Sequence, residues 1–531
     1  MNATDSNINQ PYSPMIQKSL MSALLILCLV FTAVAQNQDE IVEQIVLEAT
    51  ENSQIEEMAH HLMDVIGPRL VGTPQMQHAH DWAVETFENW GITARNEQFG
   101  EWRGWERGIT HVDMISPRVV TLEAMQLAWS PPTPEGGVEA GLVIIPEVSD
   151  EEEFSAWLPN AEGKFVMISM HQPTGRPDYN WEEFATEESL EKIRQERQDA
   201  TRAWRERIAN TGHNNRTLVQ ALEEAGAAGI IMSNWSQGFG TNKIFGAGTE
   251  NIPTIDILLE DYGMLYRLVE SGHDPVIRVR AESKDHGVVP TFNTIAEIRG
   301  TEKPDEYIIL SAHYDSWEAG TGATDNGTGS ITMMEVARIL KKIYPNPKRT
   351  ILVGLWGAEE QGLNGSAAFV EDNPDIVEGL QALFNQDNGT GRVVSISGQG
   401  FVNSYDYLGR WLSAAPRDVT QHIETTFPGM PSGGGSDHAS FVSAGAPGFF
   451  LSSLNWSYWN YTWHTNRDTY DKLVFDDVRN NVILIATLAY MASEDPEKTS
   501  RERRVLPINP RTGEQMTWPN PRTPNRRGGL N

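Results

Sequence analysis

The sequence of 531 residues contains a single cysteine, Cys28. This cysteine lies inside an apolar run at residues 20–35, which we expect to be missing from the mature chain. A mature chain without cysteine has no disulfide and no thiol chemistry. A cysteine nucleophile is therefore excluded as the basis of any catalysis.

Positive charge is also scarce. The chain has 41 Lys and Arg residues against 72 Asp and Glu residues, which gives a formal net charge of −31. Such a charge repels nucleic acids and anionic membranes, and it keeps an exported protein in solution. We expect no nucleic-acid partner and interpret the excess charge as a solvated acidic surface.

The apolar run at 20–35 follows Lys18 and ends in the small residues AVA (33–35). A basic flank, a short apolar core and such an end are typical of a secretory signal peptide. The alternative is a membrane anchor, but a spanning helix needs roughly 20 apolar residues. We therefore expect a signal peptide at 1–35, cleavage after Ala35, and a secreted or periplasmic protein without a stable membrane span. The lack of disulfides fits a bacterial periplasm or exterior.

The length of the chain predicts two or three domains. Residues 36–115 contain helical spacing of apolar residues at 41–65 and 76–90, and we assign them to the N-terminal part of a catalytic domain. Residues 116–285 differ, because they contain short β-rich runs and one charged, helix-like insertion at 181–208. The β-rich runs lie at 142–147, 164–169, 254–259 and 275–283, and a helix leading into a strand is expected at 217–233.

From 286 to 497 strands and helices alternate, which favours an α/β layered sheet. Strands are expected at 306–312, 350–357, 380–386 and 448–453, and helices at 330–344 and 475–493. The tail, 498–531, has eight Lys and Arg residues, two Glu residues and five prolines. We expect this tail to be disordered or draped over the surface. A weaker alternative is an anchor to an acidic surface.

Histidine and carboxylate residues follow the predicted strands. His313 and Asp315 follow the strand at 306–312, Glu359 and Glu360 follow the strand at 350–357, and Asp387 follows the strand at 380–386. Ligands of open α/β sheets bind at the carboxyl ends of the strands. We therefore expect these side chains to meet at one place.

These residue types suit zinc, which binds histidine nitrogen and carboxylate oxygen. A pair of zinc ions needs a bridging ligand, and Asp325, in the glycine-rich loop GTGATDNGTGS, is the natural bridge. Asp315 is two residues after His313, so its carboxylate can accept the second ring N–H of that histidine. Glu359 and Glu360 point apart. We assign Glu360 as a ligand and Glu359 as the general base.

Two further segments are expected near this site. His464 lies in the aromatic stretch NWSYWNYTWHTNRDTY, which is either a packed loop or the wall of a substrate pocket. In the second case Tyr461 and Trp463 contact the substrate. The loop GGGSDHASF (433–441) carries Asp437 and His438, which we expect to line the site rather than to bind metal.

Five motifs together resemble one family. HYDSWEAGTGATDNGTGS, WGAEEQGLNGS, NQDNG, SDHASF and WHTNRDTYD occur in this order, and they resemble the M28 family of zinc exopeptidases, especially the branch that includes plasma glutamate carboxypeptidase. The resemblance covers roughly residues 291–495. Residues 116–285 resemble a protease-associated (PA) domain, with AGAAGIIM (225–232) as the most typical segment.

The resemblance implies the fold and the ligand scheme. The fold is a three-layer α/β/α sandwich with a central mixed sheet and an inserted, β-rich PA domain. Two Zn²⁺ ions are implied, with Asp325 as their bridge and Glu359 as the base. The remaining ligands are His313 and Asp387 for one ion, and Glu360 and His464 for the other. The peptide bond after the bridging aspartate is often cis in this family, so we expect the same at Asp325–Asn326.

The M20 family uses a similar order of ligands. It inserts a dimerisation domain before the last histidine, and the stretch from Asp387 to His464 is too short for that insertion. The extra domain of this chain instead precedes His313, which favours M28.

The expected reaction is hydrolysis of a terminal peptide bond of a peptide substrate. Glu359 takes a proton from a metal-activated water and passes it to the leaving amine. Among exopeptidases we favour an aminopeptidase, the commoner activity among exported bacterial relatives, over a carboxypeptidase or dipeptidase. Three alternatives stay open: a glutaminyl-cyclase-like transferase with one zinc, a receptor-like binding protein without metals, and a partner-binding role of the inserted domain.

Overall fold

The computed structural model describes residues 38–529. The expected signal peptide therefore lies outside the described residues. Within 38–529, no helix combines the length and apolar character that a membrane crossing requires.

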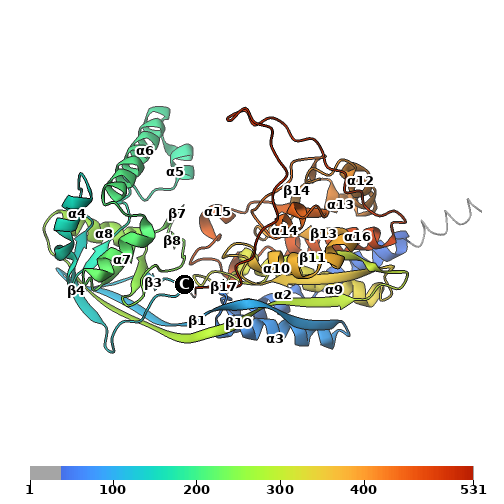
Figure 1. The fold of residues 1–531 in the computed structure, drawn as a ribbon, viewed down its shortest axis with the longest axis horizontal. Helices are drawn as coiled ribbons and strands as arrows, with labels where there is room; N and C mark the ends of the chain where they lie inside the picture. The colour runs from blue at the N-terminus through green and yellow to red at the C-terminus, as the bar shows by residue number, and fades with distance from the viewer. Residues whose placement is uncertain (1–37, 530–531) are drawn as a thin grey trace, which may run out of the picture.

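The larger of two groups of elements is built around a central mixed sheet (Figure 1). Its strand β11 pairs in parallel with β12 and β13, β13 pairs in parallel with β16, and β10 is antiparallel to β12. The four strands predicted for this region are present. In sheet order the strands are β15 (Glu424–Thr426), β14 (Val393–Ser397), β16 (Gly448–Ser453), β13 (Leu380–Asn385), β11 (Lys303–His313), β12 (Arg349–Trp356) and β10 (Val276–Ile298).

Side chains that alternate along β11 enter two different cores. Ile308 and Leu310 join one core and Ile309 joins the other, because successive side chains of a strand point to opposite faces. The first core is covered by a helix at 38–51, α2 (Ile55–His60), α3 (Pro74–Asn89), α9 (Thr328–Ile343), α12 (Ser404–Ala414), α13 (Arg417–Thr420) and α16 (Phe475–Glu494). The second is covered by α10 (Asn364–Asp372), α11 (Pro374–Gly379) and α14 (His438–Ser443). The predicted three-layer α/β/α sandwich is confirmed.

The helix expected at 41–65 is interrupted. It ends at 51, and α2 and a π-helical turn, His61–Ile66, follow after a short break at 52–54.

Two long antiparallel strands, β1 (Thr93–Ser116) and β10, run along one side of the molecule (Figure 1). One end of β10 pairs with β12 of the central sheet, and the other end pairs with β4 (Val138–Ile144). The two strands thus connect the central sheet to a second group of elements. The sequence did not predict β1, whose apolar residues alternate irregularly.

The second group of elements lies within 116–285, and we call it the inserted module. Strands β4, β5 (Phe165–Met167), β6 (Gly229–Met232) and β9 (Thr254–Ile257) are parallel, and β3 (Ala124–Gln126) closes the edge. A core on each face packs against α4 (Glu151–Trp157), α7 (Asn215–Glu224) and α8 (Leu259–Glu270). The charged insertion forms α5 (Asp178–Phe184) and α6 (Glu187–Asn210), which project from the module in Figure 1.

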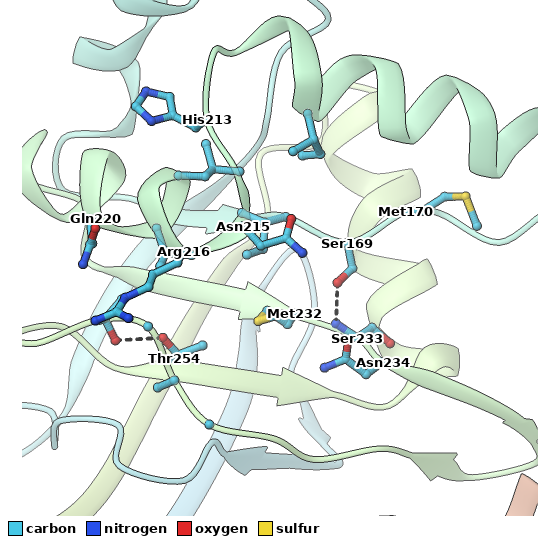
Figure 2. A pocket seen from close by; sticks show the side chains of 18 of the residues that line it. Ser169, Met170, His213, Asn215, Arg216, Gln220, Met232, Ser233, Asn234 and Thr254 are labelled. Carbon is cyan, nitrogen blue, oxygen red and sulfur yellow. Dashed lines mark hydrogen bonds between the residues drawn. The ribbon is translucent and has the colours of Figure 1, made fainter. Parts of the chain in front are cut away.

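A cavity of about 910 Å³ is lined mostly by the inserted module, together with Arg103 of β1 and Gly529 of the tail (Figure 2). Ser169 and Ser233 line it just beyond the ends of β5 and β6, where the Ser233 N–H donates to Ser169 Oγ at 2.9 Å. None of the predicted metal or substrate residues lines this cavity, so the predicted chemistry lies elsewhere.

The basic tail lies against the surface at several points. Trp518 Nε1 donates to the carbonyl oxygen of Val442 at 2.8 Å. Further along, β17 (Arg527–Gly528) pairs in parallel with Glu101 and Trp102 of β1. The tail therefore contacts first α14, which covers the second core, and then β1.

Candidate metal centre

The ends of three parallel strands bring the predicted ligands together. β11 ends at His313, β12 ends just before Glu359 and Glu360, and β13 ends just before Asp387. Asp325 lies in the turn Ala323–Gly327 before α9. These four segments meet at the carboxyl edge of the sheet, as the α/β pattern predicts.

Asp325 is shared between two groups of donor atoms. His313 Nε2 is 3.4 Å from Asp325 Oδ1 and 3.1 Å from Asp387 Oδ1. On the other side, His464 Nε2 is 3.3 Å from Asp325 Oδ2 and 2.9 Å from Glu360 Oε2. Each oxygen of Asp325 thus faces a different histidine. The two groups could each hold one metal ion, with Asp325 common to both.

Buried oxygen atoms in this cluster lack protein partners. Asp325 Oδ2 and Glu360 Oε1 are buried without a hydrogen bond. Burial raises the pKa of Glu360 well above its usual range, and the neighbouring Asp325 charge raises it further. Crowded carboxylates of this kind are stabilised by cations, and the nitrogen and oxygen donors match those of zinc. The residues therefore fit a metal pair.

The loop that carries Asp325 is fixed by Asp468. The Asp468 carboxylate accepts the N–H groups of Thr324, at 2.8 Å, and of Asp325, at 3.0 Å. The Asp325–Asn326 peptide bond is cis, which confirms the expectation from the resemblance. Asn326 Nδ2 donates to the carbonyl oxygen of Gln386 at 2.9 Å, so this loop is also tied to the segment that carries Asp387.

The carboxylate of Asp315 does not bind the ring of His313, as was predicted, but two backbone N–H groups. His313 Nδ1 lies 3.0 Å from the backbone carbonyl oxygen of Asp315, and the carboxylate is farther away, at 3.7 Å. The carboxylate instead accepts the N–H groups of Glu359, at 3.1 Å, and Glu360, at 3.2 Å. The side chain was expected to orient the histidine, but its two oxygens are better placed for the two adjacent backbone donors. Asp315 therefore positions the Glu359–Glu360 segment.

A buried arginine supports the loop after His313. The Arg69 guanidinium donates to the carbonyl oxygens of Tyr314 at 2.8 Å, Thr321 at 2.9 Å and Gly322 at 2.9 Å. Sequence reasoning missed Arg69, because its partners are backbone atoms about 250 positions away.

The inserted module holds the loop that carries His464. The hairpin of β7 (Trp235–Gly238) and β8 (Thr241–Asn242) lies against this loop, and the Ile244 N–H donates to the His464 carbonyl oxygen at 2.9 Å. Asn242 N donates to Asn466 Oδ1 at 3.1 Å. His464 has a φ of 59°, which is rare for a residue other than glycine. These contacts of residues 242–244 hold the backbone at His464, whose Nε2 lies 3.3 Å from Asp325 Oδ2.

A cleft of about 590 Å³ opens over the cluster. Of the predicted substrate residues, His438 and Trp463 line it. Burial lowers the pKa of His438 to about 3, so its imidazole is neutral. Asp437 is fully buried and does not line the cleft. Tyr461 does not line it either, since its hydroxyl lies 3.1 Å from the hydroxyl of Tyr179 in the inserted module.

The cleft also contains residues that sequence reasoning missed. Tyr458, from the helical turn α15 (Tyr458–Tyr461), lines the cleft and is 4% exposed. Burial raises the pKa of its hydroxyl, and Asp325 raises it further. Arg522 reaches the cleft from the basic tail. The aromatic stretch drew attention to the region of Tyr458, but no sequence signal pointed to Arg522.

Comparisons with known proteins agree with this geometry. Residues 293–489 match the model of peptidase family M28. Carboxypeptidase Q of Mus musculus is 26% identical over 449 residues, which are 83% of this chain and 86% of that protein. The crystal structure of a peptidase M28 precursor from Shewanella amazonensis SB2B matches with a TM-score of 0.64 and 24% identity, over 89% of this chain and 100% of that one. A zinc aminopeptidase from Bacillus subtilis matches with a TM-score of 0.55 and 19% identity, over 85% of this chain and 96% of that one. The last two likenesses concern the fold.

Proposed function

We propose that this chain, whose residues 293–489 belong to peptidase family M28, is an exported zinc exopeptidase that holds two metal ions. The observation that supports it best is the position of Asp325, whose two oxygens face His313 and His464 separately. His313, Asp325 and Asp387 would hold one ion, and Asp325, Glu360 and His464 the other.

Zinc bound in such a pair lowers the pKa of a coordinated water and polarises a carbonyl group. The side chain of Glu359 lines the cleft and belongs to neither donor group, so it is free to accept a proton. Its backbone is held by Asp315, which keeps its carboxylate over the cluster. We assign Glu359 as the base that takes the proton from water and delivers it to the leaving amine.

The relatives support cleavage at a chain end. The mouse protein is named a carboxypeptidase, and the Bacillus subtilis protein is a zinc aminopeptidase. The substrate is therefore a peptide with a free terminus. Of the two directions, the sequence favours the aminopeptidase.

The remaining assignments complete the proposal. Residues 1–35 serve as the signal peptide, and export leads to the periplasm or the exterior. The inserted module is a PA-like domain that supports the His464 loop, as the contact between Ile244 and His464 suggests. A partner-binding role of this module is a second candidate, and its cavity of about 910 Å³ is the observation in its favour.

The test is metal content together with peptide hydrolysis. The purified chain should contain two zinc ions, lose hydrolysis of aminoacyl nitroanilides or N-blocked dipeptides on chelation, and regain it with zinc. One ion together with cyclisation of N-terminal glutamine would instead indicate the transferase. A chain that binds no metal would indicate the receptor-like alternative.

A further inference from the structure

The charged residues that line the cleft are unevenly distributed. Its carboxylates are Asp325, Glu359, Glu360 and Asp387, all members of the metal cluster or the proposed base. Among the lining residues no other carboxylate is left to pair with the α-amine of a substrate. Arg522 is the only Lys or Arg among them.

The tail is anchored on both sides of Arg522. Before it, Trp518 Nε1 donates to Val442 O at 2.8 Å. After it, the Asn525 N–H donates to Asn364 Oδ1 at 2.7 Å, and Arg526 forms an ion pair with Asp372 at 2.8 Å. Val442 and Asn364 belong to α14 and α10, which cover the same face of the sheet. Arg522 is therefore held above the cleft between two fixed points.

The Arg522 guanidinium forms a single hydrogen bond among the described residues. Its Nη2 donates to the carbonyl oxygen of Gly433 at 2.8 Å. Within residues 38–529, no carboxylate lies at ion-pair distance from it, whereas Arg501, Arg526 and Arg527 of the same tail are all paired with Asp or Glu. A guanidinium has five N–H donors in a planar fork that matches a carboxylate. One backbone contact leaves most of this fork available.

A second cation lies near the cluster but is placed differently. Lys243, from the inserted module, has its Nζ 3.9 Å from the centroid of the Trp463 ring. Lys243 is not among the residues that line the cleft, whereas Trp463, on which its ammonium group packs, is. Among the described residues that line the cleft, Arg522 is thus the one Lys or Arg that a bound substrate can contact.

We propose that Arg522 is a specificity-determining residue that binds a free carboxylate of the substrate. This inference rests on the proposed function and gives it a direction: the enzyme acts on short peptides with a free carboxylate near the scissile bond, as a carboxypeptidase or dipeptidase does. It also assigns a role to the basic tail, which carries this cation over the cleft.

The test uses the zinc-loaded full chain and three blocked dipeptides, with an aminoacyl nitroanilide as the aminopeptidase substrate for comparison. The dipeptides are an N-blocked dipeptide with a free α-carboxylate, its C-terminal amide, and an N-blocked dipeptide amide that ends in glutamate. The wild type should favour the free acid over its amide in kcat/KM. Arg522→Ala should lower this preference about tenfold, the size of one charge-assisted hydrogen bond, and Arg522→Glu should lower it further. Arg511→Ala is the matched control, since Arg511 is an exposed cation of the same tail with no side-chain partner among the described residues.

The outcomes distinguish failure of the role of Arg522 from failure of the proposed function. A preference that falls in both Arg522 variants, and not in Arg511→Ala, supports the inference. If the glutamate amide is cleaved as well as the free acid, and its cleavage also falls in the Arg522 variants, Arg522 binds a side-chain carboxylate as well, which also supports the inference. An unchanged preference in the Arg522 variants, or a wild type that favours aminoacyl nitroanilides, overturns the inference and leaves the exopeptidase standing. Failure of the zinc-loaded wild type to cleave any of these substrates, aminoacyl nitroanilides or unblocked dipeptides overturns the proposed function itself.

Discussion

The Ile244 N–H of the inserted module donates a 2.9 Å hydrogen bond to the carbonyl oxygen of His464. His464 completes the second group of candidate ligands, so a residue outside the central sheet helps to build the candidate metal centre. Its positive φ makes this support necessary, because the left-handed region is unfavourable for a residue with a Cβ atom.

Replacement of Ile244 by proline should weaken the second metal site. Proline has no N–H, so the bond to His464 is lost and the imidazole is free to turn from Glu360. We expect bound zinc to fall from two ions toward one and turnover to fall at least tenfold, measured by metal analysis and steady-state kinetics. Ile244→Val keeps the N–H and should retain both ions. Two ions and full turnover in Ile244→Pro would show that the hydrogen bond from Ile244 does not position His464.

Asp315→Asn should impair the base and the neighbouring ligand together. The asparagine amide offers one acceptor where two backbone N–H groups need partners, so the Glu359–Glu360 segment loses one of its two hydrogen bonds. We expect zinc affinity to fall by about 10- to 100-fold, as is usual when a group that supports a ligand is changed. Competition with a zinc chelator measures this. Unchanged affinity would mean that the segment keeps its place without Asp315.

Glu359→Gln should separate metal binding from turnover. The amide cannot accept a proton, and Glu359 lies outside both donor groups. Zinc content should stay at two ions, while kcat should fall by about 10²–10⁴, the usual contribution of a general base. Glu302→Gln is the control, because Glu302 is an exposed carboxylate just before β11, at the end of the strand opposite to His313. Normal turnover in Glu359→Gln would refute its role.

His80 should make the fold sensitive to acid. It is buried in α3, its Nδ1 lies 2.8 Å from Thr294 Oγ1, and burial lowers its pKa to about 3. Between about pH 6.5 and 3 the unfolded chain binds a proton that the folded chain does not, so this contribution to stability is complete above pH 6.5 and is lost as the pH falls.

His80→Gln keeps a polar partner for Thr294 and removes this titration. The melting temperature of His80→Gln should therefore fall less than that of the wild type between pH 6.5 and 4.5. His78→Gln, at an exposed position of the same helix, should behave like the wild type. Parallel curves for His80→Gln and the wild type would contradict the assignment.

The candidate ligands could be predicted because they depend on local pattern. A continuous apolar run predicts a buried strand, such as β11 or β12, and the residue that follows each strand lies at a common edge. His313, Glu360 and Asp387 were found in this way. His464 lacks such a strand, and only the family resemblance indicated it.

The features that the sequence did not predict depend on contacts between residues that are far apart in the chain. Asp315 was assigned to its sequence neighbour His313, yet its carboxylate bonds to a segment 44 positions away. The long strand β1 was not expected, because glycines such as Gly100 interrupt its apolar pattern. That glycine allows close approach of the tail, since a Cβ there would lie 2.5 Å from the carbonyl oxygen of Arg526. No local sequence pattern predicts the course of the tail that brings Arg522 to the cleft.

Anomalous diffraction at the zinc edge from crystals of the full chain tests most directly whether Asp325 joins two metal ions. We predict two peaks about 3.5–4 Å apart, one between His313 and Asp387 and one between Glu360 and His464, with an oxygen of Asp325 bound to each. A single peak, or peaks that Asp325 does not share, would contradict this prediction.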